Sequence, residues 1–297
     1  MKAEFLMRSL MFVPAHNERL MDSASRSSAD VLLLDLEDSC MPNSNKQVGR
    51  DKIISYINNN KFNNKIIFPR VNERCSGELL KDVHQLSLKG VTGFMYPKAY
   101  CPEDVYFFGK LLETIEYEKN IPIGTFKIIP LIETSGSILT VQRICEVCIN
   151  RVVAVAFGHL DYVNDIQGRN TKLEDNISVA RMLVVVGARA AGVIPIDTIH
   201  PHEVHDLVDL ERRLKTGKDL GYEGMLVLNP KEIPLVHQYY SPSEEEVIWA
   251  NEILYLSNEA VKNGEGVAIK NNKFIGPPIV KLAENILKKN KLVRDGK

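Results

Sequence analysis

The chain has 297 residues, 44% of them hydrophobic and 25% charged, which is the composition of a folded globular protein and excludes a disordered or low-complexity chain. Its 37 Lys and Arg nearly balance its 38 Asp and Glu, so the basic excess of a nucleic-acid binder is missing. No apolar run approaches the ~20 residues that cross a bilayer. With an odd count of five cysteines and no signal peptide, these features predict a reduced, cytoplasmic protein without membrane or nucleic-acid partners.

Eight short apolar runs, most of them continuous rather than alternating, are typical of strands buried on both faces. They are Leu10–Pro14, Val31–Leu36, Ile66–Val71, Gly93–Pro97, Lys127–Ile132, Val152–Phe157, Val193–Asp197 and Met225–Leu228. The stretches between them are long enough for helices, namely Glu18–Ala29, Val48–Asn59, Gly77–Leu88, Pro102–Tyr117, Ile138–Ile149, Ile177–Ala191 and Val204–Leu220.

This alternation predicts a parallel sheet, and eight such units suit a TIM (β/α)8 barrel over residues 1–235. The main competitor is an open doubly wound sheet, but no G-x-G-x-x-G motif follows the first strand. The pattern changes in residues 236–297. There we expect a helix from Ser241-Pro242 to about Lys262, a hairpin of Val267–Lys270 with Lys273–Ile275, and a helix from Pro277 to about Lys289. This C-terminal helical and hairpin extension would cap the barrel or pack on a neighbouring subunit.

Polar residues follow nearly every predicted strand, at the rim where barrel enzymes place their active sites. Charged groups that abut buried runs are costly unless they are paired or bound to metal. The residues concerned are Asp35, Glu37, Asp38, Arg70, Asn72, Lys98, Glu133, His159, Asp161, Asp197 and Asn229. Several such ends on one rim indicate a functional site.

Glu133 and Asp161 follow neighbouring strands, and two carboxylates so close would repel unless a cation lay between them. Oxygen ligands favour Mg²⁺ or Mn²⁺ over Zn²⁺. Asp35 and Asp38 could then orient water molecules around the ion. The alternative is that these acids form structural ion pairs with basic residues such as Arg70, Lys98 or Arg181.

Arg70 is the candidate anion clamp, because a guanidinium can hold a carboxylate or a thioester oxygen with two hydrogen bonds. Lys98 could hold a phosphate or simply close the fourth strand. His16 and His159 are weaker candidates, and we interpret His200, His202 and His205 as loop residues rather than a metal site.

Several blocks of sequence resemble the citrate lyase beta subunit family, which includes malyl-CoA and citramalyl-CoA lyases and is similar to aldolases of 2-oxo-4-hydroxy acids. The blocks run in order along the chain: Arg8–Pro14, Leu34–Asp38, Pro69–Asn72, Ile129–Thr134, Ala188–Gly192, Ile196–Thr198 and Ser241–Glu246. The resemblance implies a TIM barrel, a Mg²⁺-dependent site, a CoA thioester substrate and a homotrimer or a pair of trimers.

The resemblance also implies roles for individual residues. Glu133 and Asp161 match the family's metal ligands, and Arg70 matches its substrate-binding arginine. Asp38, with Asp35 or Glu37, matches the acidic segment near the metal. Pro14, in the first block, joins Arg70 and Glu133 as a predicted substrate-binding residue.

The chain departs from the family pattern at two points. The family usually reads Gly-Lys-Met-(Val/Ile)-Asp-x-Pro near its C-terminus, where the Asp is an acid/base group. Here Gly276 stands at the Asp position, and Asn229-Pro230 replaces the usual His-Pro. A glycine cannot carry a proton, so another group would have to protonate the product enolate; Asp35, Asp38, His16 and water on the metal are the candidates.

The sequence therefore predicts a Mg²⁺-dependent carbon–carbon lyase. It would cleave a 3-hydroxyacyl-CoA of the citramalyl-, malyl- or citryl-CoA type into acetyl-CoA and a 2-oxo acid such as pyruvate. Two alternatives remain open at this point. One is a CoA-independent 2-oxo-acid aldolase, and the other is a citrate-lyase-type subunit that is inactive without a carrier partner.

Overall fold

The computed structural model describes residues 5–63, 65–171, 175–199, 206–264, 266–270 and 273–296. The predicted histidine loop with His200, His202 and His205 lies outside these residues. The chain divides into two compact units, Met7–Val236 and His237–Lys297, with Phe5 and Leu6 belonging to the second.

The first unit is a barrel of eight strands in which every strand pairing is parallel. The strands are β1 (Ser9–Pro14), β2 (Val31–Asp35), β3 (Ile66–Ile67), β4 (Gly93–Tyr96), β5 (Lys127–Ile132), β6 (Ala154–Phe157), β7 (Ile194–Asp197) and β8 (Gly224–Val227). Their order, β3-β2-β1-β8-β7-β6-β5-β4, leaves only the β3–β4 seam to be closed. The predicted (β/α)8 barrel is confirmed.

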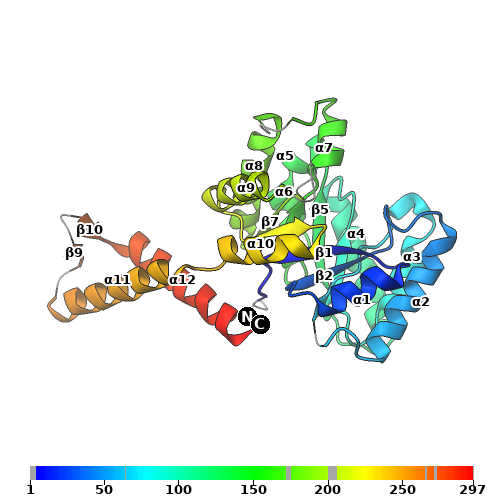
Figure 1. Ribbon diagram of the computed structural model, residues 1–297, viewed down its shortest axis with the longest axis horizontal. Coiled ribbons are helices and arrows are strands. Elements are labelled where there is room, and N and C mark those ends of the chain that lie inside the picture. The colour runs from blue at the N-terminus through cyan, green and yellow to red at the C-terminus, as the bar shows by residue number, and fades with distance from the viewer. Residues whose placement is uncertain are drawn as a thin grey trace. The chain divides into compact units, whose positions relative to one another are not determined.

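Helices connect the strands and cover the outside of the sheet (Figure 1). They are α1 (Glu18–Arg26), α2 (Ser44–Asn58), α3 (Leu79–Leu86), α4 (Pro102–Glu118), α5 (Ser135–Leu139), α6 (Val141–Glu146), α7 (His159–Asp165), α8 (Asp175–Ala191) and α9 (Leu207–Leu220). Three short elements, η1 (Arg74–Ser76), η2 (Pro230–Glu232) and α10 (Ile233–Tyr240), complete this list. Strands β2, β4, β6 and β8 are buried along their whole length, because helices pack on one face and barrel side chains on the other.

Pro69 shortens the third strand, which was predicted to run to Val71. Proline has no N–H to donate to a ladder, so regular pairing stops at Ile67. The backbone nevertheless closes the seam: the Met95 N–H donates to the Pro69 carbonyl at 2.9 Å, and Arg70 bridges both Asp35 and Met95. The barrel is thus complete around Arg70.

One helix prediction is wrong, and two helices were not predicted. The single helix expected over Ile138–Ile149 is divided, because Thr140 adopts a non-helical conformation (φ −123°) that separates α5 from α6. The sequence reasoning also missed α7, which follows β6, and α10, which follows β8.

The second unit contains α11 (Glu244–Lys262), β9 (Ala268–Lys270), β10 (Lys273–Ile275) and α12 (Pro277–Asp295). Strands β9 and β10 form an antiparallel hairpin, and the residues between them lie outside the described part of the chain. Ser243 caps α11 reciprocally with Glu246, which explains why the helix begins there. The unit has a small core of its own, built from Ala250, Ile253, Ala260, Ala268, Ile275 and Ala283. Over the described residues, no helix is both long enough and apolar enough to span a bilayer.

Candidate functional site

A cluster of charged side chains lies at the carboxyl ends of β2 to β6, all within the barrel unit. Asp35, Glu37 and Asp38 come from the end of β2, and Arg70 comes from the segment after β3. Lys98, Glu133 and Asp161 follow β4, β5 and β6. The residues that the sequence predicted as a site are therefore on one rim.

Asp35 holds Arg70 in place. The guanidinium donates from Nε to Oδ1 and from Nη2 to Oδ2, each at 2.7 Å. Asp35 also accepts hydrogen bonds from the Glu37 and Ser39 amides and from the Ser39 hydroxyl. Burial alone would raise the pKa of this carboxyl, but the Arg70 charge and these hydrogen bonds outweigh it and lower the pKa. Asp35 is thus ionised, and both of its oxygens accept hydrogen bonds from other groups of the protein.

The remaining edge of Arg70 faces two further carboxylates. Its Nη1 atom lies 3.0 Å from Glu37 Oε2 and 3.4 Å from Asp38 Oδ2. The ring of Phe12 lies 4.8 Å below the guanidinium carbon and so fixes its plane. Asp38 is largely exposed, whereas Glu37 is buried. Only the Nη1 edge of Arg70 is therefore placed to meet a substrate.

Lys98 contacts three acidic residues of the site. Its ammonium lies 3.3 Å from Glu37 and 3.5 Å from Glu73, and its backbone N–H donates to Glu133 Oε2 at 2.9 Å. Its backbone is left-handed (φ +49°), which lets the amide and the side chain point to different carboxylates. The structure thus favours an ion-pairing role for Lys98 over a free phosphate-binding one.

Glu133 and Asp161 are brought together by the pairing of β5 with β6. Ile132 pairs with Phe157, so Glu133 stands beside Gly158, which caps α7. A Cβ atom on Gly158 would lie 2.6 Å from Glu133 Cγ, so only glycine leaves room for this side chain. The carboxylate therefore lies against the start of the helix that carries Asp161.

Two buried carboxyls titrate abnormally here. The pKa of Glu133 is raised to about 8 by burial and by the negative charges of Glu37 and Asp161. The pKa of Glu37 is raised to about 7, mainly by burial, although Arg70 and Lys98 oppose the shift. The site has an excess of acidic groups, because six carboxyls face two cations, Arg70 and Lys98. The six are Asp35, Glu37, Asp38, Glu73, Glu133 and Asp161.

This excess fits a divalent cation. Across the described residues, Glu133 and Asp161 form no ion pair with a basic side chain, and the basic residues proposed as their partners are paired elsewhere. Arg181 instead pairs with Asp197, and Arg70 with Asp35. In that same part of the chain, no group of three or more His, Cys, Asp or Glu is arranged to hold a metal. Mg²⁺ commonly takes only one or two protein carboxylates, so the pair suits it better than Zn²⁺.

The other predicted residues lie near this centre in supporting positions. Pro14 ends β1 in the same row as Asp35, its pairing partner in β2. His159 is buried with Nδ1 2.5 Å from the Thr198 hydroxyl, which matches a structural role. Asn72 donates to Asp82 and accepts from Lys46, so it braces the segment after Arg70.

Sequence reasoning missed two contributors to the site, and it considered Lys98 only for its side chain. Gly158 acts through the absence of a side chain, and Glu73 pairs with Lys98. Lys98 also acts through its backbone amide, which donates to Glu133. Of the two missed residues, only the glycine directly after a buried strand gave a signal in the sequence.

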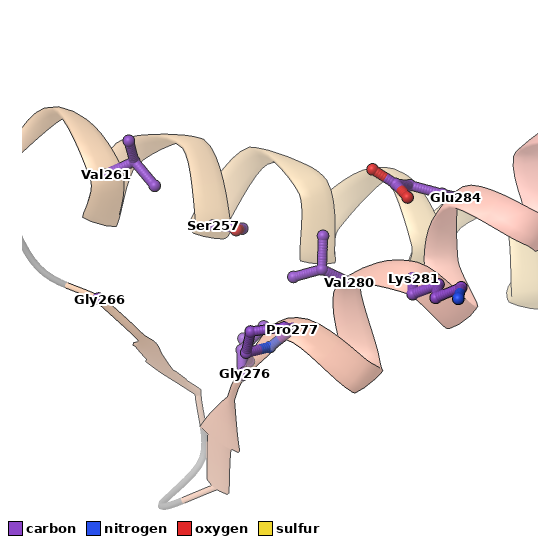
Figure 2. A pocket seen from close by; sticks show the side chains of 9 residues that line it. Ser257, Val261, Gly266, Gly276, Pro277, Val280, Lys281 and Glu284 are labelled. Carbon is purple, nitrogen blue, oxygen red and sulfur yellow. The ribbon is translucent and has the colours of Figure 1, made fainter.

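Gly276 lies in the second unit at the N-terminus of α12, beside a pocket of about 330 Å³ (Figure 2). Figure 2 shows Ser257 and Val261 on one side of this pocket and Pro277 and Val280 on the other. A Cβ on Gly276 would meet only Pro278 Cδ, at 3.8 Å. The position therefore has space for a larger side chain, although it carries none.

These features define an enzyme-like parallel barrel whose acidic, all-oxygen site opens at the carboxyl ends of the strands. Residues 8–230 match the family model described as HpcH/HpaI aldolase/citrate lyase, and the chain belongs to this family.

Named relatives align over almost the whole chain. The citrate lyase subunit beta of Leuconostoc mesenteroides subsp. cremoris is 25% identical, over 97% of this chain and 94% of its own length. The human mitochondrial citramalyl-CoA lyase is 26% identical, over 94% and 84%. The structure of CitE from Mycobacterium tuberculosis with magnesium, acetoacetate and coenzyme A has a TM-score of 0.74 at 22% identity, covering 98% of this chain and 100% of that one. The chain is thus an enzyme of the lyase class.

Proposed function

We propose that this protein is a Mg²⁺-dependent carbon–carbon lyase that cleaves a 3-hydroxyacyl-CoA into acetyl-CoA and a 2-oxo acid such as pyruvate. The observation that carries the proposal is the Glu133–Asp161 pair, which lies beside Arg70 with no basic partner among the described residues. Relatives named citramalyl-CoA lyase and a related structure with magnesium and coenzyme A support the substrate class.

Glu133 and Asp161 would hold the ion, with Mn²⁺ as an alternative metal. When bound there, the cation would supply Lewis-acid polarisation of the substrate hydroxyl and of the carbonyl it becomes. Asp38, exposed at the same rim, would orient water molecules, and Pro14 would line the substrate's side of β1.

Arg70 would stabilise the negative charge that develops on the thioester oxygen when the carbon–carbon bond breaks. Asp35 fixes the orientation of the guanidinium, and the Nη1 edge, which lies against Glu37 and the exposed Asp38, is the edge that would turn to the substrate oxygen. Removing one such donor typically costs about 10²–10³ in rate. Asp35 is unsuited to return a proton to the enolate carbon because its pKa is lowered. Glu37, buried beside Arg70, is the better placed carboxyl.

We further propose that the chain works as a homo-oligomer, a trimer or a pair of trimers. In such an assembly the extension, residues 236–297, would pack on a neighbouring subunit. Sedimentation equilibrium on the full chain would test the assembly size.

A cleavage assay tests the reaction itself. Purified full chain is given citramalyl-, malyl- and citryl-CoA with and without Mg²⁺, and the released oxo acid is measured with a coupled NADH dehydrogenase. Glu133→Gln should lose more than about 100-fold in kcat/KM, because loss of even an outer-sphere partner costs 10–100-fold. Glu118→Gln, a change at an exposed glutamate on α4, is the matched control and should be unchanged.

The outcomes separate the alternatives. Cleavage of one substrate that is lost in Glu133→Gln supports the proposal and identifies the oxo acid. Cleavage of the free acid without CoA would instead favour an aldolase. CoA binding without cleavage of any substrate would favour a subunit that needs a carrier partner.

A further inference from the structure

The two proposed metal ligands lie on different elements, so their spacing has to be fixed by other contacts. Glu133 directly follows β5, whereas Asp161 lies in the first turn of α7. Mg²⁺ requires near-ideal octahedral geometry at about 2.0–2.1 Å. Without the cation, the two carboxylates repel each other. A site of this kind therefore needs a tie that holds the two segments together.

Helix α7 cannot provide that tie by itself. It has only seven residues, and helices shorter than about 12 residues are marginal in water without tertiary contacts. Of its side chains, His159 and Val163 are buried. The position of Asp161 thus depends on how the rest of the helix is anchored.

Asp165 anchors the helix at the required place. It lies one turn after Asp161 and accepts two hydrogen bonds from Ser135, one from the backbone N–H and one from the hydroxyl, each at 2.7 Å. Ser135 is two residues beyond Glu133. The pKa of Asp165 is lowered by these same bonds, first by the backbone donor and then by the hydroxyl. The interaction therefore joins the segment that carries Glu133 to α7, the helix that carries Asp161.

The segment on the Glu133 side is rigid enough to transmit this tie. Thr134 caps α5 reciprocally with Ser137: the Ser137 N–H donates to Thr134 Oγ1 at 3.2 Å, and the Thr134 N–H donates to Ser137 Oγ at 3.0 Å. A displacement of Ser135 is therefore passed on through Thr134, the one residue that separates it from Glu133.

We propose that Asp165 is a positioning residue, which sets the spacing between Glu133 and Asp161 through Ser135 and thereby sets the affinity of the site for Mg²⁺. The inference rests on the proposed function and adds a residue that acts on the metal site without touching the ion or the substrate.

The test measures Mg²⁺ affinity directly, by titration calorimetry of MgCl₂ into the full-length protein. Asp165→Ala should weaken Mg²⁺ binding about 10-fold, the order expected when hydrogen bonds to a charged acceptor are lost. Ser135→Ala should weaken it less, because the backbone donor remains. The double variant should be no weaker than Asp165→Ala alone, since both changes remove one interaction. Asp165→Asn, which keeps an acceptor oxygen, should recover part of the affinity.

Asn164→Ala is the matched control, because it removes an exposed polar side chain from the same helix, and it should bind Mg²⁺ like wild type. In the cleavage assay, Asp165→Ala should raise the half-saturating Mg²⁺ concentration and leave kcat at saturating Mg²⁺ unchanged. A general loss of structure would lower kcat instead.

Two results would overturn the inference, and they can be told apart. If Glu133→Gln abolishes Mg²⁺ binding but Asp165→Ala and Ser135→Ala bind within twofold of wild type, the tie is unimportant and the proposed function stands. If wild type itself binds no Mg²⁺, the metal site and the tie both fail. Should Asp165→Ala not fold, Asp165→Asn combined with Ser135→Ala decides, because together they remove the acceptor charge and the hydroxyl donor: an affinity equal to that of wild type refutes the proposed role of Asp165.

Discussion

Gly158→Ala tests whether the position of Glu133 controls catalysis. The added methyl carbon would lie 2.6 Å from Glu133 Cγ and 2.8 Å from its Oε1. Carbon atoms in contact normally lie about 3.5–4.0 Å apart, so relief requires a movement of roughly 1 Å. Glu133 is buried, and the Lys98 amide holds its other oxygen at 2.9 Å, so the carboxylate cannot simply rotate away. The strain therefore falls on the proposed metal ligand.

A misplacement of about 1 Å in an active site can cost about 10²-fold, equivalent to roughly 2.7 kcal/mol of transition-state stabilisation. We expect kcat/KM of Gly158→Ala to fall by about that factor in the Mg²⁺-dependent cleavage assay. The free energy of unfolding should fall by about 1–3 kcal/mol from overpacking, which denaturant titration would measure.

Gly136→Ala is the control for this change. Gly136 lies in α5 near the same rim, and the nearest atom to its added Cβ is the Tyr100 carbonyl oxygen at 3.9 Å. This variant should keep full activity and gain up to about 1 kcal/mol of stability, because alanine is the better helix former. A Gly158→Ala enzyme as active as the Gly136→Ala enzyme would refute the reasoning.

Three further predictions concern the clamp, the fold and the extension. Arg70→Lys should fold but lose about 10²–10³ in kcat, since lysine cannot hold Asp35 bidentately while it reaches the substrate; unchanged steady-state kinetics would exclude the clamp role. Glu116→Gln should lower the free energy of unfolding by about 3–5 kcal/mol, because it leaves the buried Arg151 charge uncompensated. The pKa of Glu116 is lowered, since hydrogen bonds and the Arg151 charge outweigh burial, so the pair stabilises the fold above pH 4.5 and less as the pH falls through the folded value. We would measure the free energy of unfolding by circular dichroism at a series of pH values below 4.5. It should fall less steeply with pH in Glu116→Gln than in wild type, and an equally steep fall would contradict this role of the Glu116–Arg151 pair. Gly276→Asp should melt like wild type, because its Cβ has space, and should raise kcat at least tenfold if a carboxyl there can protonate the enolate; a large drop in the melting temperature would show that the space is not available.

The barrel was predictable because each strand leaves a local signature. Runs such as Val31–Leu34 are apolar at every position, which is typical of a strand buried on both faces, and stretches long enough for helices lie between them. The candidate site was partly predictable for the same reason, because parallel strands bring their carboxyl ends to one rim.

The details of the site depend on geometry that residue types do not encode. No pattern indicates that Lys98 adopts a left-handed backbone, or that its amide rather than its ammonium serves Glu133. The bidentate pairing of Arg70 with Asp35, rather than with Glu37 or Asp38, likewise depends on which of these three acidic side chains points into the barrel. The break of one predicted helix at Thr140 followed from a backbone turn within an otherwise regular apolar pattern.

The closure of the barrel at Arg70 has a consequence for the dynamics of the site. Across the seam between β3 and β4, the Met95 N–H donates to the Pro69 carbonyl at 2.9 Å and the Val71 N–H donates to the Met95 carbonyl at 3.2 Å, so both chain neighbours of Arg70 are bonded to β4. On the other side, the Arg70 amide donates to the Leu34 carbonyl of β2 at 2.9 Å. The residue that would bind the substrate is therefore also part of the backbone that closes the barrel between β3 and β4. Its amide should be among the slowest to exchange with deuterated solvent while the seam holds. Local opening of the β3–β4 seam would move Arg70 away from Glu133 and Asp161. The enzyme would then lose activity before the barrel unfolds.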